Sequence, residues 1–340
     1  MVVFEMRKKY DMLDALEKAN LKGRSILGMD AFRTRDELQG LLDVAAFLEP
    51  YARSGGLNIL PSKVMASIFF EPSTRTRLGF ESAMQKLGGS VISEATPMIT
   101  SRVASGESIE DTLRTVSKYV HIIGMRHREA AVEAAVKAGA EVPVITGGFG
   151  GKEHPVQCIV DVYTMWRNLG KIEGLNVLIP GPELVTSRVA HSQAYGLAMF
   201  NANITFATEK DGRVPKDVME RLRGLNANVK EVIDPTGQEL EDLMSQCDVL
   251  SMPAWVRGVP KEEPAKSEFL ELAKKYYVGM GPLKKAKEAG RTVYVLHPLP
   301  RLAVEMDFEI DKTENSLIWD QVELSISTRM AMILCILYGT

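Results

Sequence analysis

Short apolar runs alternate with amphipathic segments along most of the chain, and this alternation limits the fold more than any other feature. Each run has the length of a β-strand, and the segments between the runs carry apolar residues at helical spacing. A strand–helix–strand order predicts parallel strands, because a parallel connection needs a crossover about as long as a helix. We therefore expect an α/β fold with mainly parallel sheets that helices cover on both faces.

The strand candidates fall into two series. The first comprises Lys63–Phe70, Ser90–Ser93, His121–Met125 and Val142–Thr146; the second comprises Asn176–Ile179, Asn203–Ala207, Val229–Val232, Val249–Met252 and Thr292–Leu296. A chain of 340 residues is long for one core and suits two domains of about 150 residues each. We predict two doubly wound parallel-sheet domains, joined near residues 150–170 at the glycine cluster Gly147–Gly151, with a closing helix over Asp320–Leu337.

Composition argues against several classes of protein. The 41 basic and 44 acidic side chains give a formal charge of −3, so no excess positive charge is present to bind nucleic acid. No apolar run reaches the roughly 18 residues of a membrane span, and no signal peptide precedes the first charged segment. The three cysteines, Cys158, Cys247 and Cys335, are too scattered for a disulfide framework or a zinc cluster. We expect a cytoplasmic protein with no bound metal and no nucleic-acid or membrane partner.

The loop after the first strand candidate has the residue types of a phosphate site. Open α/β sheets bind ligands beyond the carboxyl ends of their strands, and Glu71–Arg77 (EPSTRTR) stands at such an end before a predicted helix. Ser73 or Thr74 can cap that helix, and the hydroxyls, the arginines and the helix N-terminus together suit a phosphate dianion. An ordinary capped helix with surface arginines fits this loop about equally well. The chain has no GxxxxGK[ST] motif, which excludes a nucleotide P-loop.

Two further loops offer groups that bind anions or polarise a carbonyl. Arg126 follows the strand candidate HIIGM, whereas Arg128 suits a solvated turn. His154 and Gln157 open a predicted helix and face the same side, because residues three apart are neighbours on a helix. A lone histidine of this kind is more often structural, so His154 gains weight only from the residues near it.

The loops of the second series add rigid carbonyls and another cation. In His297–Arg301 (HPLPR) two prolines remove N–H donors and leave backbone carbonyls for a ligand, and an X–Pro bond there is a candidate for the cis form. Arg188 begins a predicted helix after NVLIP, where it could hold a carboxylate. Together these loops would bind an anionic phosphate ester or anhydride and stabilise an oxyanion without a covalent intermediate or a cofactor.

Five motifs carry a resemblance to a known family. FxPSTRTRxxFExAxxxLGG, GESIEDTLR, MRH, EHPVQ and HPLPR occur in this order from near Gly23 to the last predicted helix. Their combination resembles the aspartate/ornithine carbamoyltransferase family. The HPLPR form is similar to the aspartate branch, since ornithine enzymes usually carry a cysteine in place of Pro298.

The resemblance implies transfer of a carbamoyl group from carbamoyl phosphate to the amino group of an amino acid. L-aspartate is the first expected acceptor, giving N-carbamoyl-L-aspartate and phosphate in pyrimidine biosynthesis. Residues 1–152, completed by a C-terminal helix over 318–340, would bind carbamoyl phosphate, and residues 153–317 would bind the amino acid, with the active site in the cleft between the two domains. The family further implies a homotrimer with shared active sites and allows a regulatory subunit, with no metal or organic cofactor.

The resemblance also implies roles for individual residues. Arg126 would bridge the phosphate and the carbonyl oxygen, and His154 and Thr76 would polarise that carbonyl. The full expected set comprises Ser73, Thr74, Arg75 and Thr76 for the phosphate; Arg126, His154, Gln157, Pro298 and Leu299 for the carbamoyl group; and Arg188, Arg257, Ser101 and Ser105 for the acceptor.

Two stretches depart from the family pattern. Ser105 occupies the position of a lysine that enters the neighbouring subunit's site, although Ser101 matches the family serine and Arg102 can supply charge. The acceptor loop, normally similar to TRVQKER, reads PAWVRGVPKEE over residues 253–263, with Trp255 near its start. These departures leave two alternatives open: a carbamoyltransferase with a less acidic acceptor, and a catalytically silent paralogue that binds carbamoyl phosphate.

Overall fold

The chain divides into two compact units. The computed structural model describes residues 11–255 and 260–338. Contacts between residues assign Met1–Tyr163 and Leu324–Thr340 to unit 1 and Thr164–Glu323 to unit 2. The division falls inside helix α8 (Pro155–Leu169), later than the boundary at 152/153 that we expected from the sequence, so that His154 and Gln157 belong to unit 1.

Unit 1 contains a four-stranded parallel sheet in the order β2-β1-β3-β4. Its strands are β1 (Val64–Phe69), β2 (Ser90–Glu94), β3 (Ile122–His127) and β4 (Val144–Phe149), and each confirms a strand that the sequence predicts. The glycine cluster is the exception to this agreement. We expect it at the junction between domains, but Gly147 and Gly148 lie within β4. At Gly147 the missing Cβ leaves room for the Thr76 side chain of the neighbouring helix.

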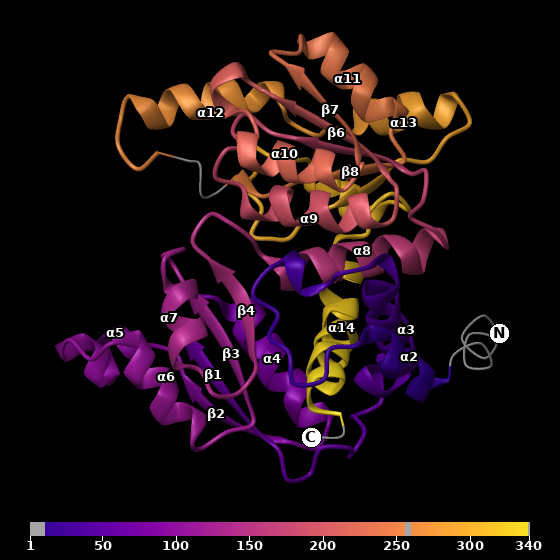
Figure 1. Ribbon diagram of the computed structural model, residues 1–340. Helices are drawn as coiled ribbons and strands as arrows, with labels where there is room; N and C mark the ends of the chain where they lie inside the picture. Colours follow the sequence, from indigo (N-terminus) through magenta and orange to yellow (C-terminus); the bar gives the residue numbers. More distant parts are fainter. Residues whose placement is uncertain (1–10, 256–259, 339–340) are drawn as a thin grey trace. The chain divides into compact units, whose positions relative to one another are not determined.

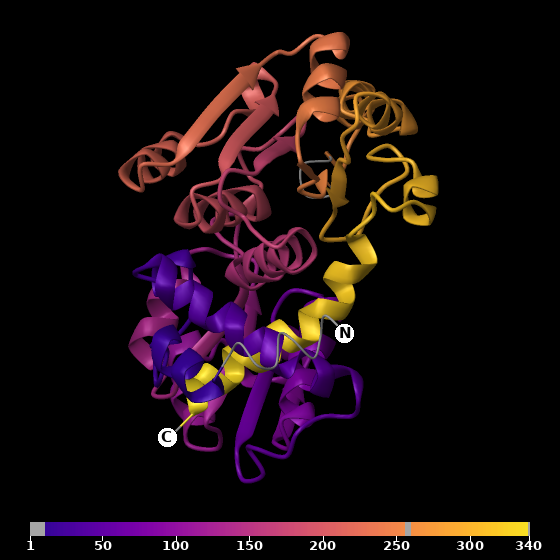
Figure 2. The same cartoon turned by 90° about the vertical axis from the view of Figure 1, so that its right-hand side faces the viewer.

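Helices cover both faces of this sheet. Figure 1 shows α6 and α7 on one side and α4 on the other. The helices of unit 1 are α2 (Met12–Ala19), α3 (Arg35–Arg53), α4 (Thr74–Lys86), α5 (Pro97–Thr100), α6 (Ile109–Ser117) and α7 (Val132–Gly139), with short 3₁₀ turns η1 (Met29–Ala31) and η2 (Arg102–Ser105). The last helix, α14 (Ile318–Leu337), returns to unit 1 (Figure 2), where Arg329 lies 5.8 Å from the centre of the Phe80 ring of α4.

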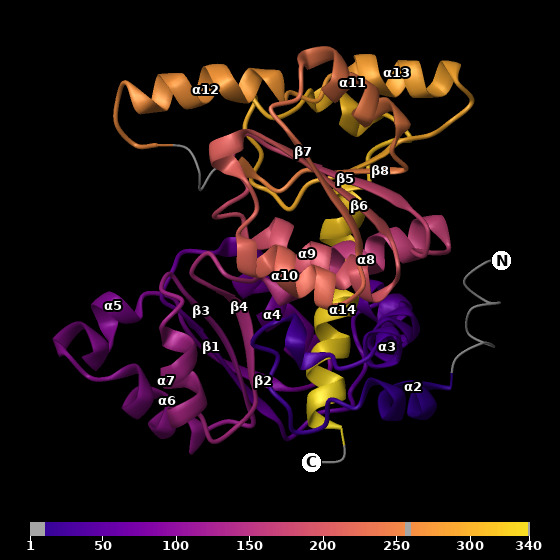
Figure 3. The ribbon, with the colours of Figure 1, turned by 45° about the horizontal axis from the view of Figure 1, so that its top comes forward.

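Unit 2 contains a five-stranded parallel sheet in the order β7-β6-β5-β8-β9. All five predicted strands are confirmed: β5 (Asn176–Pro180), β6 (Asn203–Thr208), β7 (Asn228–Ile233), β8 (Val249–Ser251) and β9 (Tyr294–Leu296). Its helices are α9 (Arg188–Met199), α10 (Lys216–Gly224), α11 (Gly237–Gln246), α12 (Ala265–Lys275) and α13 (Met280–Glu288), with 3₁₀ turns η3 (Lys210–Gly212) and η5 (Phe308–Lys312). Figure 3 shows α11 and α13 on one face of the sheet and α9 and α10 on the other. The expected α/β class is therefore confirmed for both units.

The strand orders locate the ligand-binding edge of each sheet. In unit 1 the chain places β2 on one side of β1 and then β3 on the other; in unit 2 it places β6 on one side of β5 and β8 on the other. Helices on opposite faces diverge where the winding direction reverses, and this switch point opens at the carboxyl ends of the strands. We therefore look for functional side chains between the ends of β1 and β3 and between the ends of β5 and β8. No helix in the described residues is long and apolar enough to cross a membrane.

Candidate active site

Arg126 occupies the switch point of unit 1. It pairs in register with Phe69 of β1, and the register between β3 and β4 shifts beside it, a local irregularity that re-aims a side chain. Its Nε donates a hydrogen bond to Glu71 Oε2 at 2.9 Å, and its Nη1 donates to Ser73 Oγ at 2.9 Å. These bonds use two of the five guanidinium N–H groups, so the arginine is fixed to the β1–α4 loop and retains donors for a ligand.

The start of α4 is open to an anion. Ser73 stands at the N-cap position, but its side chain accepts from Arg126 and makes no capping hydrogen bond to the first turn of the helix. Thr74 is the first helical residue and is exposed. The expected cap by Ser73 or Thr74 is therefore absent from the described structure, which leaves the first-turn N–H groups and the positive end of the helix dipole facing the loop.

Arg75 adds a second positive charge in the same turn. Burial, and then the positive charge of Arg126, hold the pKa of the Arg75 guanidinium below its usual value. In the described part of the chain no carboxylate pairs with Arg75. Two repelling cations beside an uncapped helix start destabilise the unliganded site and favour a bound dianion.

Thr76 is placed by close packing between α4 and β4. Its side chain is buried, and its Cγ2 methyl lies 2.8 Å from the point that a Cβ at Gly147 would occupy. The Cβ of Arg126 lies 3.6 Å from the same point. A glycine at position 147 is thus required for α4 to bring Thr76 next to Arg126. Unit 1 gathers Ser73, Arg75, Thr76 and Arg126 as the sequence predicts.

His154 and Gln157 lie at the beginning of α8. The backbone N–H of Gln157 donates to His154 Nδ1 at 3.3 Å, which confirms that the two residues are neighbours. A neutral histidine that accepts at Nδ1 carries its proton on Nε2 and can donate from there. The Gln157 side-chain amide donates to Asp161 Oδ1 at 2.7 Å. Glu153, which we did not single out, accepts from the Met29 N–H at 2.7 Å and fixes the segment before α8.

Arg188 and the HPLP loop stand at strand ends of unit 2. Arg188 is the first residue of α9, after β5, and its side chain is buried. In the loop after β9, the Leu299 N–H donates to His297 Nδ1 at 3.0 Å, and Leu299 has a φ of 57°, an unusual conformation for a branched residue. The Leu299–Pro300 peptide bond is cis, in agreement with the sequence expectation for this loop.

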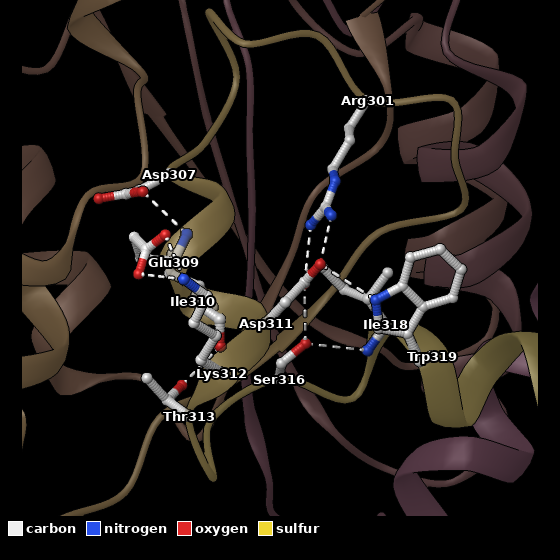
Figure 4. A network of polar contacts seen from close by, with 10 residues as sticks. All are labelled: Arg301, Asp307, Glu309, Ile310, Asp311, Lys312, Thr313, Ser316, Ile318 and Trp319. Carbon is white, nitrogen blue, oxygen red and sulfur yellow. Dashed lines mark hydrogen bonds and ion pairs between the residues drawn. The ribbon is translucent and has the colours of Figure 1, made fainter.

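Arg301 holds this loop rather than a ligand. Its guanidinium makes a two-pronged ion pair with Asp311 (Figure 4), of which the Nη1–Oδ1 distance is 2.7 Å. It also lies 4.4 Å from the centre of the Phe308 ring. Asp311 also accepts from Trp319 Nε1 at 3.0 Å. The hydrogen bond from Arg301 is the main cause that holds the pKa of the Asp311 carboxyl below its usual value.

A buried glutamate joins the loops after β8 and β9. Glu305 is fully buried; its Oε1 accepts from the Trp255 backbone N–H at 2.6 Å, and its Oε2 accepts from the Leu302 N–H. Neither Glu305 nor Glu71 is among the site residues that we predict from the sequence. A signal was available for each residue: Glu305 has apolar neighbours on both sides in LAVEM after HPLPR, and Glu71 follows an apolar strand. Acidic residues are rarely buried without a partner.

The remaining predicted site residues lie elsewhere or outside the description. Ser101 caps η2 by accepting from the Val103 N–H at 3.1 Å, and Ser105 is the exposed last residue of that turn. No hydrogen bond in the described structure joins either serine to Arg126. Arg257 lies outside the described residues. Among the residues that the structure describes, no three His, Cys, Asp or Glu side chains gather in a way that could hold a metal ion.

Two family models match the chain in sequence order. The model for the carbamoyl-phosphate-binding domain of aspartate/ornithine carbamoyltransferases matches residues 24–167. The model for the aspartate/ornithine-binding domain of the same enzymes matches residues 173–336.

Individual relatives are similar over nearly their whole length. A ureidoglycine carbamoyltransferase from Rubrobacter xylanophilus is 40% identical over 317 residues, 93% of this chain and 92% of that protein. An aspartate carbamoyltransferase catalytic subunit from Thermococcus gammatolerans is 39% identical over 314 residues, 92% of this chain and 96% of that protein.

Solved structures are similar in fold as well. Aspartate transcarbamoylase from Trypanosoma cruzi, in complex with carbamoyl aspartate and phosphate, has a TM-score of 0.84 at 27% identity and covers 96% of this chain and 100% of that chain. The catalytic subunit of the Methanocaldococcus jannaschii enzyme has a TM-score of 0.77 at 33% identity and covers 91% of this chain and 96% of that chain. The resemblance read from the five motifs is confirmed: the chain belongs to the aspartate/ornithine carbamoyltransferase family and is a carbamoyltransferase.

Proposed function

We propose that this enzyme exchanges a carbamoyl group between phosphate and the α-amino group of ureidoglycine, with diureidoacetate as the carbamoylated product. Ureidoglycine is an α-amino acid whose side chain is a neutral ureido group. The arrangement at Arg126 carries the carbamoyl phosphate half of the proposal. An arginine fixed by Glu71 and Ser73 stands at an uncapped helix start beside a second arginine, which no carboxylate of the described residues pairs with. This arrangement suits a phosphate dianion.

The proposed chemistry follows from the donors at this site. The neutral amine attacks the carbamoyl carbon, and negative charge develops on the carbonyl oxygen. The remaining N–H groups of Arg126, the Nε2–H of His154 and the Thr76 hydroxyl would stabilise that oxyanion, while Gln157 and the carbonyls of the HPLP loop would hold the carbamoyl amide. The C–O bond to phosphate then breaks, phosphate leaves bound to the first turn of α4, and a phosphate oxygen takes the proton of the amine. Positioning and preorganised charge supply the catalysis.

The acceptor assignment rests on which charges the chain provides. Arg188 would hold the α-carboxylate that both candidate acceptors share. The β-carboxylate of aspartate would need further cations, because an ionised carboxylate without a partner is expensive to bury. Ser105 replaces the family lysine, and Pro260 replaces the glutamine of the acceptor loop. A neutral ureido group needs no such cation, and a ureidoglycine carbamoyltransferase is among the similar proteins.

Aspartate is the second candidate. Several aspartate carbamoyltransferases are similar to this chain, and identities of 40% and 39% are too close to decide between the two acceptors. Arg102, Arg257 and Lys261 are basic residues near the altered stretches, and they could supply the charge that the β-carboxylate needs. In this reading the product would be N-carbamoyl-L-aspartate, the precursor of pyrimidines.

The reverse reaction separates these candidates. Ureidoglycine is an aminal and decomposes in water, so the purified enzyme is given phosphate with either diureidoacetate or N-carbamoyl-L-aspartate. Carbamoyl phosphate is captured by coupling to an ornithine carbamoyltransferase. We expect kcat/KM to be higher for diureidoacetate by about 100-fold or more, since an acceptor site rejects a compound whose polar side-chain groups it leaves unpaired. A preference for N-carbamoyl-L-aspartate would overturn the acceptor assignment, and no turnover of either compound would favour the silent paralogue.

We also propose that the active enzyme is a cytoplasmic homotrimer in which the segment with Ser101 and Ser105 reaches a neighbouring subunit's site. The exposure of η2 and the lack of a bond between these serines and Arg126 in the described structure support this reading. Light scattering on the purified protein should give three times the chain mass. A monomer with full activity would refute shared sites.

A further inference from the structure

Trp255 carries a buried hydrogen-bond donor that nothing satisfies. Its side chain is 3% exposed, and its indole Nε1 has no hydrogen-bond partner in the described structure. Buried N–H groups in native proteins nearly always have an acceptor, and one without an acceptor calls for an explanation such as a bound ligand. The chemistry described so far assigns no role to this indole.

The indole lies at the switch point of unit 2. Nε1 is 2.8 Å from the point that a Cβ at Gly181 would occupy, and Gly181 directly follows β5. Trp255 itself follows β8, the strand that pairs with β5 on the side where the winding direction reverses. Arg188 opens the helix that follows the same β5. The unsatisfied N–H therefore lies beside Gly181 and Leu184, next to the edge where the strand order predicts a ligand.

The indole is held rigidly in this place. The backbone N–H of Trp255 is bound to Glu305, and the ring packs edge-on against Tyr276, with ring centres 6.3 Å apart and an angle of 82° between the planes. Tyr276 is buried in turn, and its hydroxyl donates to Glu209 Oε1 at 2.6 Å. A donor fixed by Glu305 and Tyr276 is preorganised, which is the property that a recognition group needs.

Three other buried polar atoms lack a hydrogen-bond partner in the described residues, and each has a different setting. Nε2 of His297 faces a carboxylate oxygen of Glu305 at 3.4 Å. Nε of Arg329 lies in the core of unit 1 under α4, and Oε1 of Glu231 belongs to the outer strand β7. Of these four atoms, the Trp255 indole nitrogen is the neutral donor at a switch point.

We propose that the indole N–H of Trp255 donates the hydrogen bond that recognises the side-chain carbonyl oxygen of a ureido acceptor. This inference rests on the proposed function and deepens it by naming the residue that selects the acceptor. A single neutral donor satisfies a neutral carbonyl oxygen, whereas a carboxylate at the same place would keep its charge uncompensated. Trp255 thereby favours binding of a ureido side chain over that of the aspartate β-carboxylate.

The test removes the N–H and keeps an aromatic ring. Phosphorolysis by the Trp255→Phe enzyme is compared for diureidoacetate and for N-carbamoylglycine, which lacks the second ureido group. We expect kcat/KM for diureidoacetate to fall about 3- to 10-fold, the effect of one hydrogen bond to a neutral group, and that for N-carbamoylglycine to stay unchanged. Trp319→Phe is the matched control, because it removes an indole N–H that donates to Asp311. The ratio of kcat/KM for diureidoacetate to that for N-carbamoylglycine should not change in this variant.

A binding measurement separates this inference from a purely structural role. The chain has three tryptophans, so protein labelled with ¹⁵N-tryptophan gives three indole N–H signals, and Trp255→Phe identifies one of them. Diureidoacetate with phosphate should shift that signal, and phosphate alone should not. An unshifted signal and an unchanged ratio in Trp255→Phe, with an active wild-type enzyme, would overturn this inference alone. A wild-type enzyme that ignores diureidoacetate would overturn the proposed function instead.

Discussion

Replacement of Arg126 by alanine tests the central group of the proposed site. The guanidinium has five N–H donors, of which Glu71 and Ser73 use two. The donors that remain are held by these partners at the carboxyl end of β3, so their direction costs no reorganisation when the carbonyl oxygen becomes charged. Arg126→Ala removes these donors and also releases Ser73, whose hydroxyl can then turn to cap α4.

The expected loss follows from this geometry. Removal of one preorganised oxyanion donor usually lowers kcat by about 10²–10³, equivalent to about 2.7–4 kcal/mol of transition-state stabilisation. Binding of carbamoyl phosphate should weaken less, because Arg75 and the first turn of α4 remain. Arg126→Lys keeps the positive charge but cannot bond to Glu71 and Ser73 and still present donors in the same plane, so it should recover only part of the rate.

The assay measures kcat and KM for phosphate in the phosphorolysis of the preferred carbamoyl compound, together with calorimetric binding of carbamoyl phosphate. Arg128→Ala is the matched control, since Arg128 lies two residues further on, is exposed, and loses the same charge. We expect Arg128→Ala to keep kcat within about 3-fold of the wild-type value. The reasoning fails if Arg126→Ala also keeps kcat within that range while the protein remains folded by circular dichroism.

Three further predictions concern the loop after β9 and the switch point of unit 1. Arg301 lowers the pKa of Asp311, so the ion pair stabilises the fold above the ordinary aspartate pKa of about 3.9, and this stabilisation is lost as the pH falls below that value. Asp311→Asn should therefore lower the unfolding temperature at pH 7 and change the unfolding temperature less at pH 3, as measured by calorimetry. Gly147→Ala should displace Thr76 and raise KM for carbamoyl phosphate roughly tenfold, and an unchanged KM in a folded variant would contradict the packing argument. Arg75→Gln should weaken binding of carbamoyl phosphate but leave the unfolding temperature equal or higher, since it removes a positive charge beside the Arg126 guanidinium; a clear drop in that temperature would count against the reasoning.

The fold could be predicted from the sequence because the patterns that indicate strands and helices are local in the chain. All nine predicted strands are present, since short apolar runs between amphipathic helices have few alternatives to a parallel sheet. The error at Gly147 has a physical cause: local propensity treats glycine as a turn residue, while the close approach of Thr76 makes glycine necessary at this position of β4.

The residues at the site were predictable in kind but not in all their roles. Motif positions located Ser73 and Arg126, yet nothing in the sequence indicates that the serine hydroxyl bonds to the arginine instead of capping its own helix. A buried charge can have a partner far away in the chain: the Glu305 carboxylate accepts from the backbone N–H of Trp255, and only folding brings the two residues together. Sequence patterns therefore indicate which side chains gather at a strand end, while the hydrogen bonds decide which of them retain donors for a ligand.

The two switch points differ in a way that matches the two co-substrates of a carbamoyl transfer. At the end of β1 and β3 the unsatisfied groups are cationic: Arg75 and the remaining N–H groups of Arg126. At the end of β5 and β8 an unsatisfied side-chain donor is neutral, the indole N–H of Trp255. A dianion gains from the first environment and a ureido carbonyl from the second, whereas a β-carboxylate would meet a neutral donor in the second. If a cation were introduced there, as in Trp255→Arg, the preference should move toward N-carbamoyl-L-aspartate, because a positive charge would then face the β-carboxylate. Loss of diureidoacetate phosphorolysis without any gain for N-carbamoyl-L-aspartate would show that charge at this point does not set acceptor choice.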